Sequence, residues 1–170
     1  MKNLVKKIEI AANISIILVG IVLAVALVKY FFFRAPAGND RPVRNYIQKG
    51  QKVAIENVDW AKNGQTLLLV LQNGCHFCSE SAPFYKTLVQ DAAKRSDIHL
   101  VAVLPQPTDE GKKYLNELGV AIDEVRQAPL SALAIEGTPT LILVNNAGVA
   151  SEIWIGKLKP DKEAEVLSRL

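Results

Sequence analysis

Cysteine, histidine and methionine are all scarce in this chain, which has two Cys, two His and one Met among 170 residues. A small secreted domain held together by disulfides has more cysteines, spaced further apart. A four-ligand zinc site would have to use Cys75, Cys78, His76 and His99 together, and the sequence disfavours it. Two cysteines three positions apart indicate local chemistry at that point of the chain.

A strong charge imbalance is also missing. The formal net charge is +3 at pH 7, and no dense run of Lys and Arg occurs after the N-terminal segment. Nucleic-acid-binding domains carry a clustered basic surface. The sequence therefore predicts no nucleic-acid partner.

Long apolar runs are absent except for one near the N-terminus, where residues 10–28 contain no charged side chain. At a rise of 1.5 Å per residue, a helix of this length nearly spans a hydrocarbon core of about 30 Å. The aromatic residues at 30–33 suit a membrane interface. We predict a membrane anchor over residues 1–34, transmembrane over about 10–33, with the remaining chain outside the cytoplasm.

Two alternatives to this anchor are export and cleavage near Ala37, or a buried core helix. The small residues at 35–37 suit a signal peptidase, but the apolar run is longer than the usual signal-peptide core. A uniformly apolar run of this length is unusual for a core helix. Residues 35–45, rich in Pro, Gly and polar side chains, read as a linker to a folded domain over 46–170.

The domain alternates predicted strands and helices. We expect strands at 66–71 and 98–104, helices from the cysteine motif to about 95 and from an N-cap at Thr108 to Gly119, a short helix at 129–135, a hairpin of strands at 140–144 and 149–155, and a closing helix at 160–170. Val149, Ser151, Ile153 and Ile155 should share one side of the last strand. This order predicts a mixed α/β sandwich.

The motif Cys75-His76-Phe77-Cys78 falls between the first predicted strand and the helix that follows it. Cysteines at i and i+3 in a helix's first turn come within disulfide range, and the unpaired N–H groups there stabilise a thiolate. Cys75 is expected to be nearer solvent and to act as the nucleophile, and Cys78 as the resolving thiol. A cationic His76 would stabilise the thiolate further.

From about residue 46 onward, the chain resembles the thioredoxin superfamily, and in particular its extracytoplasmic membrane-anchored thiol-disulfide branch. The resemblance rests on Cys75-x-x-Cys78 after a buried strand, Pro83 at the helix-kinking spacing, Gly137-Thr138-Pro139-Thr140 before a strand, and Gly156 after the last strand. It implies a three-layer sandwich with a mixed central sheet flanked by helices.

The same resemblance implies a site and its partners. Pro139 would be cis, and Thr138 would offer its backbone to a partner chain, with Phe77 also on the partner-binding surface. The redox-active disulfide Cys75–Cys78 would be the only redox group, with no separate cofactor and no metal. Expected partners are protein thiols and disulfides, and a membrane protein that donates or accepts electrons.

Three positions depart from the family pattern. Gly74 replaces an aromatic residue before the first cysteine, and Leu69 replaces a buried acid. Ser81 stands where the branch related to cytochrome c maturation has an acid, with Glu80 one position earlier. The direction of electron flow stays open.

Two other functions remain as alternatives on this fold. A pair of thiolates could deliver copper or sense redox state, with His99 as a further ligand. A peroxiredoxin-type peroxidase is disfavoured, because Leu68 and Gln72 stand where that family has Pro and Thr or Ser.

Overall fold

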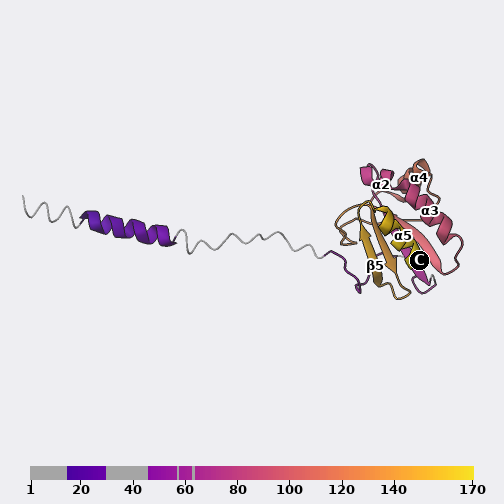
Figure 1. Cartoon of the computed structure of the whole chain (residues 1–170), viewed down its shortest axis with the longest axis horizontal. Helices are drawn as coiled ribbons and strands as arrows, with labels where there is room; N and C mark the ends of the chain where they lie inside the picture. The colour runs from indigo at the N-terminus through magenta and orange to yellow at the C-terminus, as the bar shows by residue number, and fades with distance from the viewer. Residues whose placement is uncertain (1–14, 30–45, 57, 63) are drawn as a thin grey trace, which may run out of the picture. The chain divides into compact units, whose positions relative to one another are not determined.

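A computed structural model describes residues 15–29, 46–56, 58–62 and 64–170 (Figure 1). The chain divides into two compact units, Met1–Val43 and Arg44–Leu170, which are described separately.

In the first unit, residues 15–29 form a helix whose side chains are all exposed. The rest of the predicted transmembrane span 10–33, and the predicted linker 35–45, fall outside the described residues. Within the described ranges, no helix has both the length and the apolar character needed to cross a membrane. The anchor therefore stays a prediction.

The second unit is built on a five-stranded sheet with the order β3-β2-β1-β4-β5. Its strands are β1 (Gln65–Val70), β2 (Ile98–Leu104), β3 (Glu124–Gln127), β4 (Thr140–Val144) and β5 (Ala150–Ile155). The central strand β1 runs parallel to β2 and antiparallel to β4. The sheet is mixed, as the alternation of elements and the hairpin predict.

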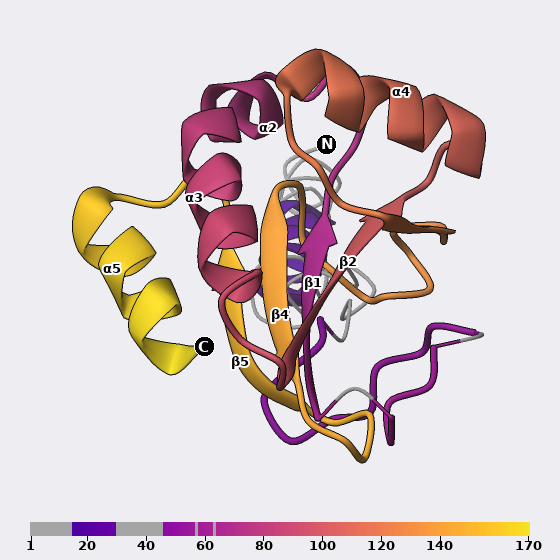
Figure 2. The ribbon, with the colours of Figure 1, turned by 90° about the vertical axis from the view of Figure 1, so that its right-hand side faces the viewer.

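Four helices pack on one face of this sheet: α2 (His76–Glu80), α3 (Ala82–Ala92), α4 (Thr108–Leu118) and α5 (Pro160–Arg169). They share a core with the buried side chains of Leu67, Leu69 and Leu71. Figure 2 shows α3 and α5 side by side next to β4. Because β1-α3-β2 and β2-α4-β3 are successive crossovers in the same direction, right-handed connections place both helices on this face.

Irregular segments, not helices, cover the opposite face. Residues from 47–60 and 128–135 pack there against Leu68, Val70 and Ile142. The predicted short helix at 129–135 is wrong, since this segment forms turns. Ala134 adopts a left-handed φ of 49°, and its carbonyl accepts a hydrogen bond of 2.7 Å from the N–H of Ile47. The tertiary contact with residue 47 has overridden local helix propensity.

Other details of the predicted secondary structure agree with the structure only in part. The helix α4 ends at Gly119, which has the expected left-handed φ of 68°, but it begins at Thr108 itself, so Thr108 is not its N-cap. The sequence did not predict β3. In β5, Ala150 and Trp154 are the buried residues, so the face formed by the odd-numbered positions is not the buried one.

Candidate functional site

The cysteines follow β1 through a tight turn. Gly74 has a φ of 79°, a conformation that residues with a side chain rarely adopt. The N–H of Cys75 then donates to the carbonyl of Gln72 at 3.1 Å, and α2 begins at the next residue. Glycine at 74, which departs from the family pattern, is explained by this turn.

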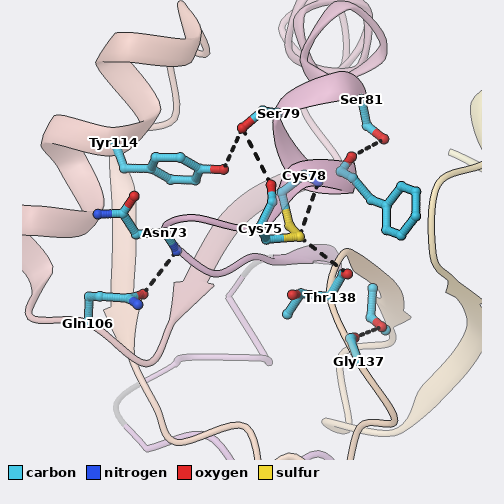
Figure 3. The surroundings of a disulfide bond; sticks show 11 residues. Asn73, Cys75, Cys78, Ser79, Ser81, Gln106, Tyr114, Gly137 and Thr138 are labelled. Atoms are coloured by element: carbon cyan, nitrogen blue, oxygen red, sulfur yellow. Dashed lines mark hydrogen bonds between the residues drawn. A yellow bond between two sulfur atoms is a disulfide. The ribbon is translucent and has the colours of Figure 1, made fainter.

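Cys75 and Cys78 form a disulfide with a Cα–Cα separation of 5.2 Å. Cys75 is the N-cap of α2 and is half-buried, whereas Cys78 is fully buried. The backbone N–H of Cys78 donates to Sγ of Cys75 at 3.2 Å (Figure 3). The sulfur of the less buried cysteine is thus the one with a preformed hydrogen-bond donor, the arrangement that stabilises a thiolate at Cys75.

The sheet register brings Thr138 and Pro139 to this disulfide. Val70, at the end of β1, pairs with Thr140, at the start of the antiparallel β4. The Thr138–Pro139 peptide bond is cis, and Sγ of Cys75 lies 3.4 Å from the carbonyl oxygen of Thr138 (Figure 3).

Two hydrogen bonds hold this proline loop. The hydroxyl group of Thr140, which is buried, donates to the carbonyl of Gly137 at 2.7 Å. The N–H of Gly156 donates to the carbonyl of Pro139, also at 2.7 Å. Gly156, singled out by the family pattern, therefore fixes the proline loop from the end of β5.

The side chain of His76, which was predicted to stabilise the thiolate, contacts Glu80. Its side chain is 76% exposed, and Nε2 lies 3.2 Å from the carboxylate of Glu80. Glu80 also accepts a hydrogen bond of 2.9 Å from Lys157, and this bond is the main reason that the pKa of Glu80 lies below its usual value. Among the described residues, no hydrogen bond joins His76 to either sulfur atom.

Phe77 and Ile155 are the large apolar side chains most exposed in the second unit, at 55% and 49%. Phe77 lies between the two cysteines in sequence, and Ile155 precedes the glycine that binds Pro139. One large exposed apolar side chain thus belongs to the cysteine motif, and the other precedes the residue that binds the proline loop.

This chain has Leu69 where thioredoxin has a buried acid, and the hydroxyl groups of Ser79 and Tyr114 lie near Cys75. Leu69 is buried in the same core as Cys78 and offers no proton acceptor. The hydroxyl of Tyr114, on α4, lies 3.4 Å from that of Ser79, which in turn lies 3.4 Å from the carbonyl of Cys75 (Figure 3). The hydroxyl of Tyr85 is buried without a hydrogen-bond partner in the part of the chain that the structure describes.

The helix break at Ser81 is the feature that Pro83 predicted. The N–H and the hydroxyl of Ser81 both donate to the carbonyl of Phe77, at 3.1 and 2.8 Å, and α3 restarts with Pro83 in its first turn. Ser81 occupies the position of the family's acid, and its hydroxyl group forms a hydrogen bond with the backbone of α2.

Some residues of the site could not be recognised from the sequence. Lys157 contacts Glu80, and Tyr114 contacts Ser79, across 77 and 35 positions of sequence. Neither pair belongs to a motif. The only signal available beforehand was the amphipathic pattern of the helix that carries Tyr114 inward.

In the described ranges, no three side chains of His, Cys, Asp or Glu lie close enough together to hold a metal ion. His99 pairs in register with Thr66 at the start of the parallel strands, whereas the cysteines follow their ends. His99 contacts Glu124 of β3 instead.

No protein-family profile and no curated protein sequence matches the chain. Solved structures do match it. The thioredoxin domain of a thiol-disulfide oxidoreductase from Bacteroides vulgatus has a TM-score of 0.55 and 18% identity, over 72% of this chain and 97% of that one.

Two further structures agree with the first. A thiol-disulfide isomerase from Corynebacterium glutamicum has a TM-score of 0.53 and 15% identity, over 73% of this chain and 92% of that one. StoA from Bacillus subtilis has a TM-score of 0.51 and 17% identity, over 71% and 93%. At such identities the match establishes the architecture: the second unit of this chain has the thioredoxin fold.

Proposed function

We propose that the chain is a thiol-disulfide oxidoreductase that exchanges disulfides with protein partners. The observation that carries this proposal is the environment of Cys75. Its half-exposed sulfur accepts the N–H of Cys78 at 3.2 Å and faces the carbonyl of Thr138 at 3.4 Å, while the second sulfur is buried beneath it. One sulfur is open to attack and the other is protected.

The exchange proceeds in two steps. In the oxidising direction, a partner thiolate attacks Sγ of Cys75, forms a mixed disulfide and releases Cys78 as a thiolate. A second partner thiolate then attacks the partner's sulfur in that mixed disulfide. This forms the partner's own disulfide and leaves Cys75 as a thiolate, which its N-cap position stabilises. One disulfide is lost and one is gained, and the reducing direction is the reverse.

The exposed Phe77 and Ile155 favour protein partners over small thiols, because large exposed apolar side chains suit contact with a protein surface. Two of the structural relatives are a thiol-disulfide oxidoreductase and a thiol-disulfide isomerase, which agrees with exchange chemistry. We place the domain outside the cytoplasm, tethered by the apolar segment at 10–33, with a membrane protein as donor or acceptor of electrons. The support is the long uncharged run of the sequence.

The test is the reduction potential of the Cys75–Cys78 couple in the full chain, kept in detergent and equilibrated against glutathione or dithiothreitol. A reversible couple near about −120 mV marks an oxidant of thiols, and one near about −270 mV a reductant. Cys75→Ser, which cannot form the couple, is the control. A disulfide that resists reduction until the domain unfolds would contradict the proposal.

A further inference from the structure

A cavity of about 590 Å³ lies beside the proline loop. Its walls come from Tyr46, at the start of the second unit, and from the irregular segment that includes Leu130, Ala134 and Ile135. Ser131, Glu136 and Gly137 complete the lining. The side chains of Tyr46, Leu130 and Ile135 are partly buried, so the cavity offers apolar surface that is still open to solvent.

The cavity and the disulfide site adjoin neighbouring residues of the proline loop. Gly137 lines it, and the next residue, Thr138, has its carbonyl oxygen 3.4 Å from Sγ of Cys75 (Figure 3). A strand-like chain advances about 3.3 Å per residue. Because Gly137 directly precedes Thr138, we expect a strand-like partner bonded to Cys75 to reach the cavity within a few residues of its cysteine, about two to four positions away.

The backbone beside the cavity is available for pairing. The N–H groups of Ile135, Glu136, Gly137 and Thr138 donate no hydrogen bond to any residue that the structure describes. Partner chains commonly bind by adding an extended segment to such a backbone, with pockets that take alternate side chains. Backbone pairing and the cavity can thus be used by the same segment.

We propose, on the basis of the exchange function above, that this cavity selects partners. Its occupant is an extended segment of a partner protein that carries an apolar or aromatic side chain two to four residues from the reacting cysteine. The single carboxylate at the cavity, from Glu136, disfavours an acidic residue there.

The experiment uses the reduced full chain in detergent and cysteine peptides activated as mixed disulfides with thionitrobenzoate. The protein dithiol is oxidised to the Cys75–Cys78 disulfide, and each activated peptide is reduced to a peptide thiol and a coloured thionitrobenzoate thiol. Peptides carry Leu, Ser or Glu at two, three or four positions before or after the cysteine. The second-order rate constant of colour release in this single turnover, which corresponds to kcat/KM, is measured for each peptide.

We expect Leu at one of these positions to raise kcat/KM about tenfold over Ser. The effect should come mainly from a lower KM, because the leucine side chain becomes partly buried in the cavity when the peptide binds. Glu at the same position should fall below Ser. Ser131→Glu places a charge in the cavity at an exposed position, and should abolish the advantage of Leu. Ser96→Glu is the matched control, because Ser96 is also exposed but does not line the cavity.

The possible outcomes distinguish failure of the cavity proposal from failure of the proposed exchange function. Equal kcat/KM for all peptides, with normal oxidation by plain thionitrobenzoate disulfide, would overturn the cavity and leave the exchange function standing. A Leu advantage that survives Ser131→Glu would also overturn it. Rates that fall as protein concentration rises would indicate that a second copy fills the cavity. Failure to react even with the plain disulfide would contradict the exchange function itself.

Discussion

A salt bridge of 2.9 Å joins Lys157, just beyond β5, to Glu80 at the end of α2. Lys157 follows Gly156, whose N–H binds the carbonyl of Pro139. The ion pair therefore connects the helix of the cysteines to the strand end that holds the proline loop. Glu80 also contacts His76, the residue predicted to act on the thiolate.

Glu80→Gln should lower the thiol pKa of Cys75 and make the couple more oxidising. The variant removes a negative charge near the thiolate and releases His76 from its carboxylate partner. We expect a shift of about 0.3 pH units, because exposed charges are well screened. The pH dependence of alkylation by iodoacetamide measures it.

His76→Ala tests the same relationship. It should change the thiol pKa of Cys75 less in the native chain than in the Glu80→Gln background, since Glu80 holds His76 in the native chain. Glu56→Gln, at an exposed position on the irregular segment, is the control for loss of one charge. Equal effects of His76→Ala in both backgrounds would show that Glu80 does not restrain His76.

Cys78→Ser should accumulate mixed disulfides with partner proteins, whereas Cys75→Ser should not. The first variant keeps the half-exposed nucleophile and removes the thiol that resolves the intermediate. The second leaves only Cys78, which is fully buried. Non-reducing electrophoresis of cells that express each full-length variant gives the answer. Adducts of equal yield from both variants would reverse the assignment of the two cysteines.

Tyr85→Phe should leave stability near neutral pH unchanged or raise it by up to about 1 kcal/mol, because the buried hydroxyl has no partner among the described residues. Burial raises the pKa of Tyr85 above its ordinary value of 10.0. The unfolded chain therefore loses this proton at lower pH than the folded chain does. The stability linked to Tyr85 is full below pH 10.0 and declines above it.

Urea unfolding at about pH 8 and about pH 11 measures both effects. The native chain should lose more stability between the two values than Tyr85→Phe does. Tyr114→Phe is the matched control, since the hydroxyl of Tyr114 already has a neighbour in Ser79. An identical decline in the native chain and in Tyr85→Phe would contradict the prediction.

Ala134→Gly should stabilise the domain slightly. The left-handed φ of 49° costs alanine about 1 kcal/mol relative to glycine, partly offset by the greater freedom of glycine in the unfolded chain. We expect a gain of up to about 0.5 kcal/mol in the free energy of unfolding. Ala132→Gly, in the same turns but with an ordinary φ, should destabilise. Two changes of the same sign would show that backbone strain at Ala134 does not matter.

The sequence predicted well those parts of the fold in which the local residue pattern and the tertiary packing favour the same structure. The apolar runs became β1 and β2, and Gly119 ended its helix as expected. β3 was missed because only Val125 is buried in its four residues, too little for a periodic signal. The segment at 129–135 has helix-forming composition, but its contact with Ile47 comes from a distant part of the chain.

The candidate site shows the same division. Cys75, Cys78 and Pro139 are recognisable because their chemistry needs a fixed local spacing, and the structure brings them together. Whether each performs its predicted role stays a prediction. His76 could not be placed from the motif, because its orientation depends on Glu80 and, through it, on Lys157. The apolar character of Phe77 was visible, but its exposure was not.

The pairing of Val70 with Thr140 has a consequence for how the chain tolerates change in length. A slip of two residues in this pairing keeps every side chain on its own face of the sheet, yet displaces Thr138 by about 7 Å relative to Cys75. The two strands could still pair, but the carbonyl of Thr138 would no longer lie beside Sγ of Cys75. We therefore expect the protein to tolerate insertions and deletions in the turns but not within β1 or β4, because the register of this strand pair sets the distance between Thr138 and Cys75.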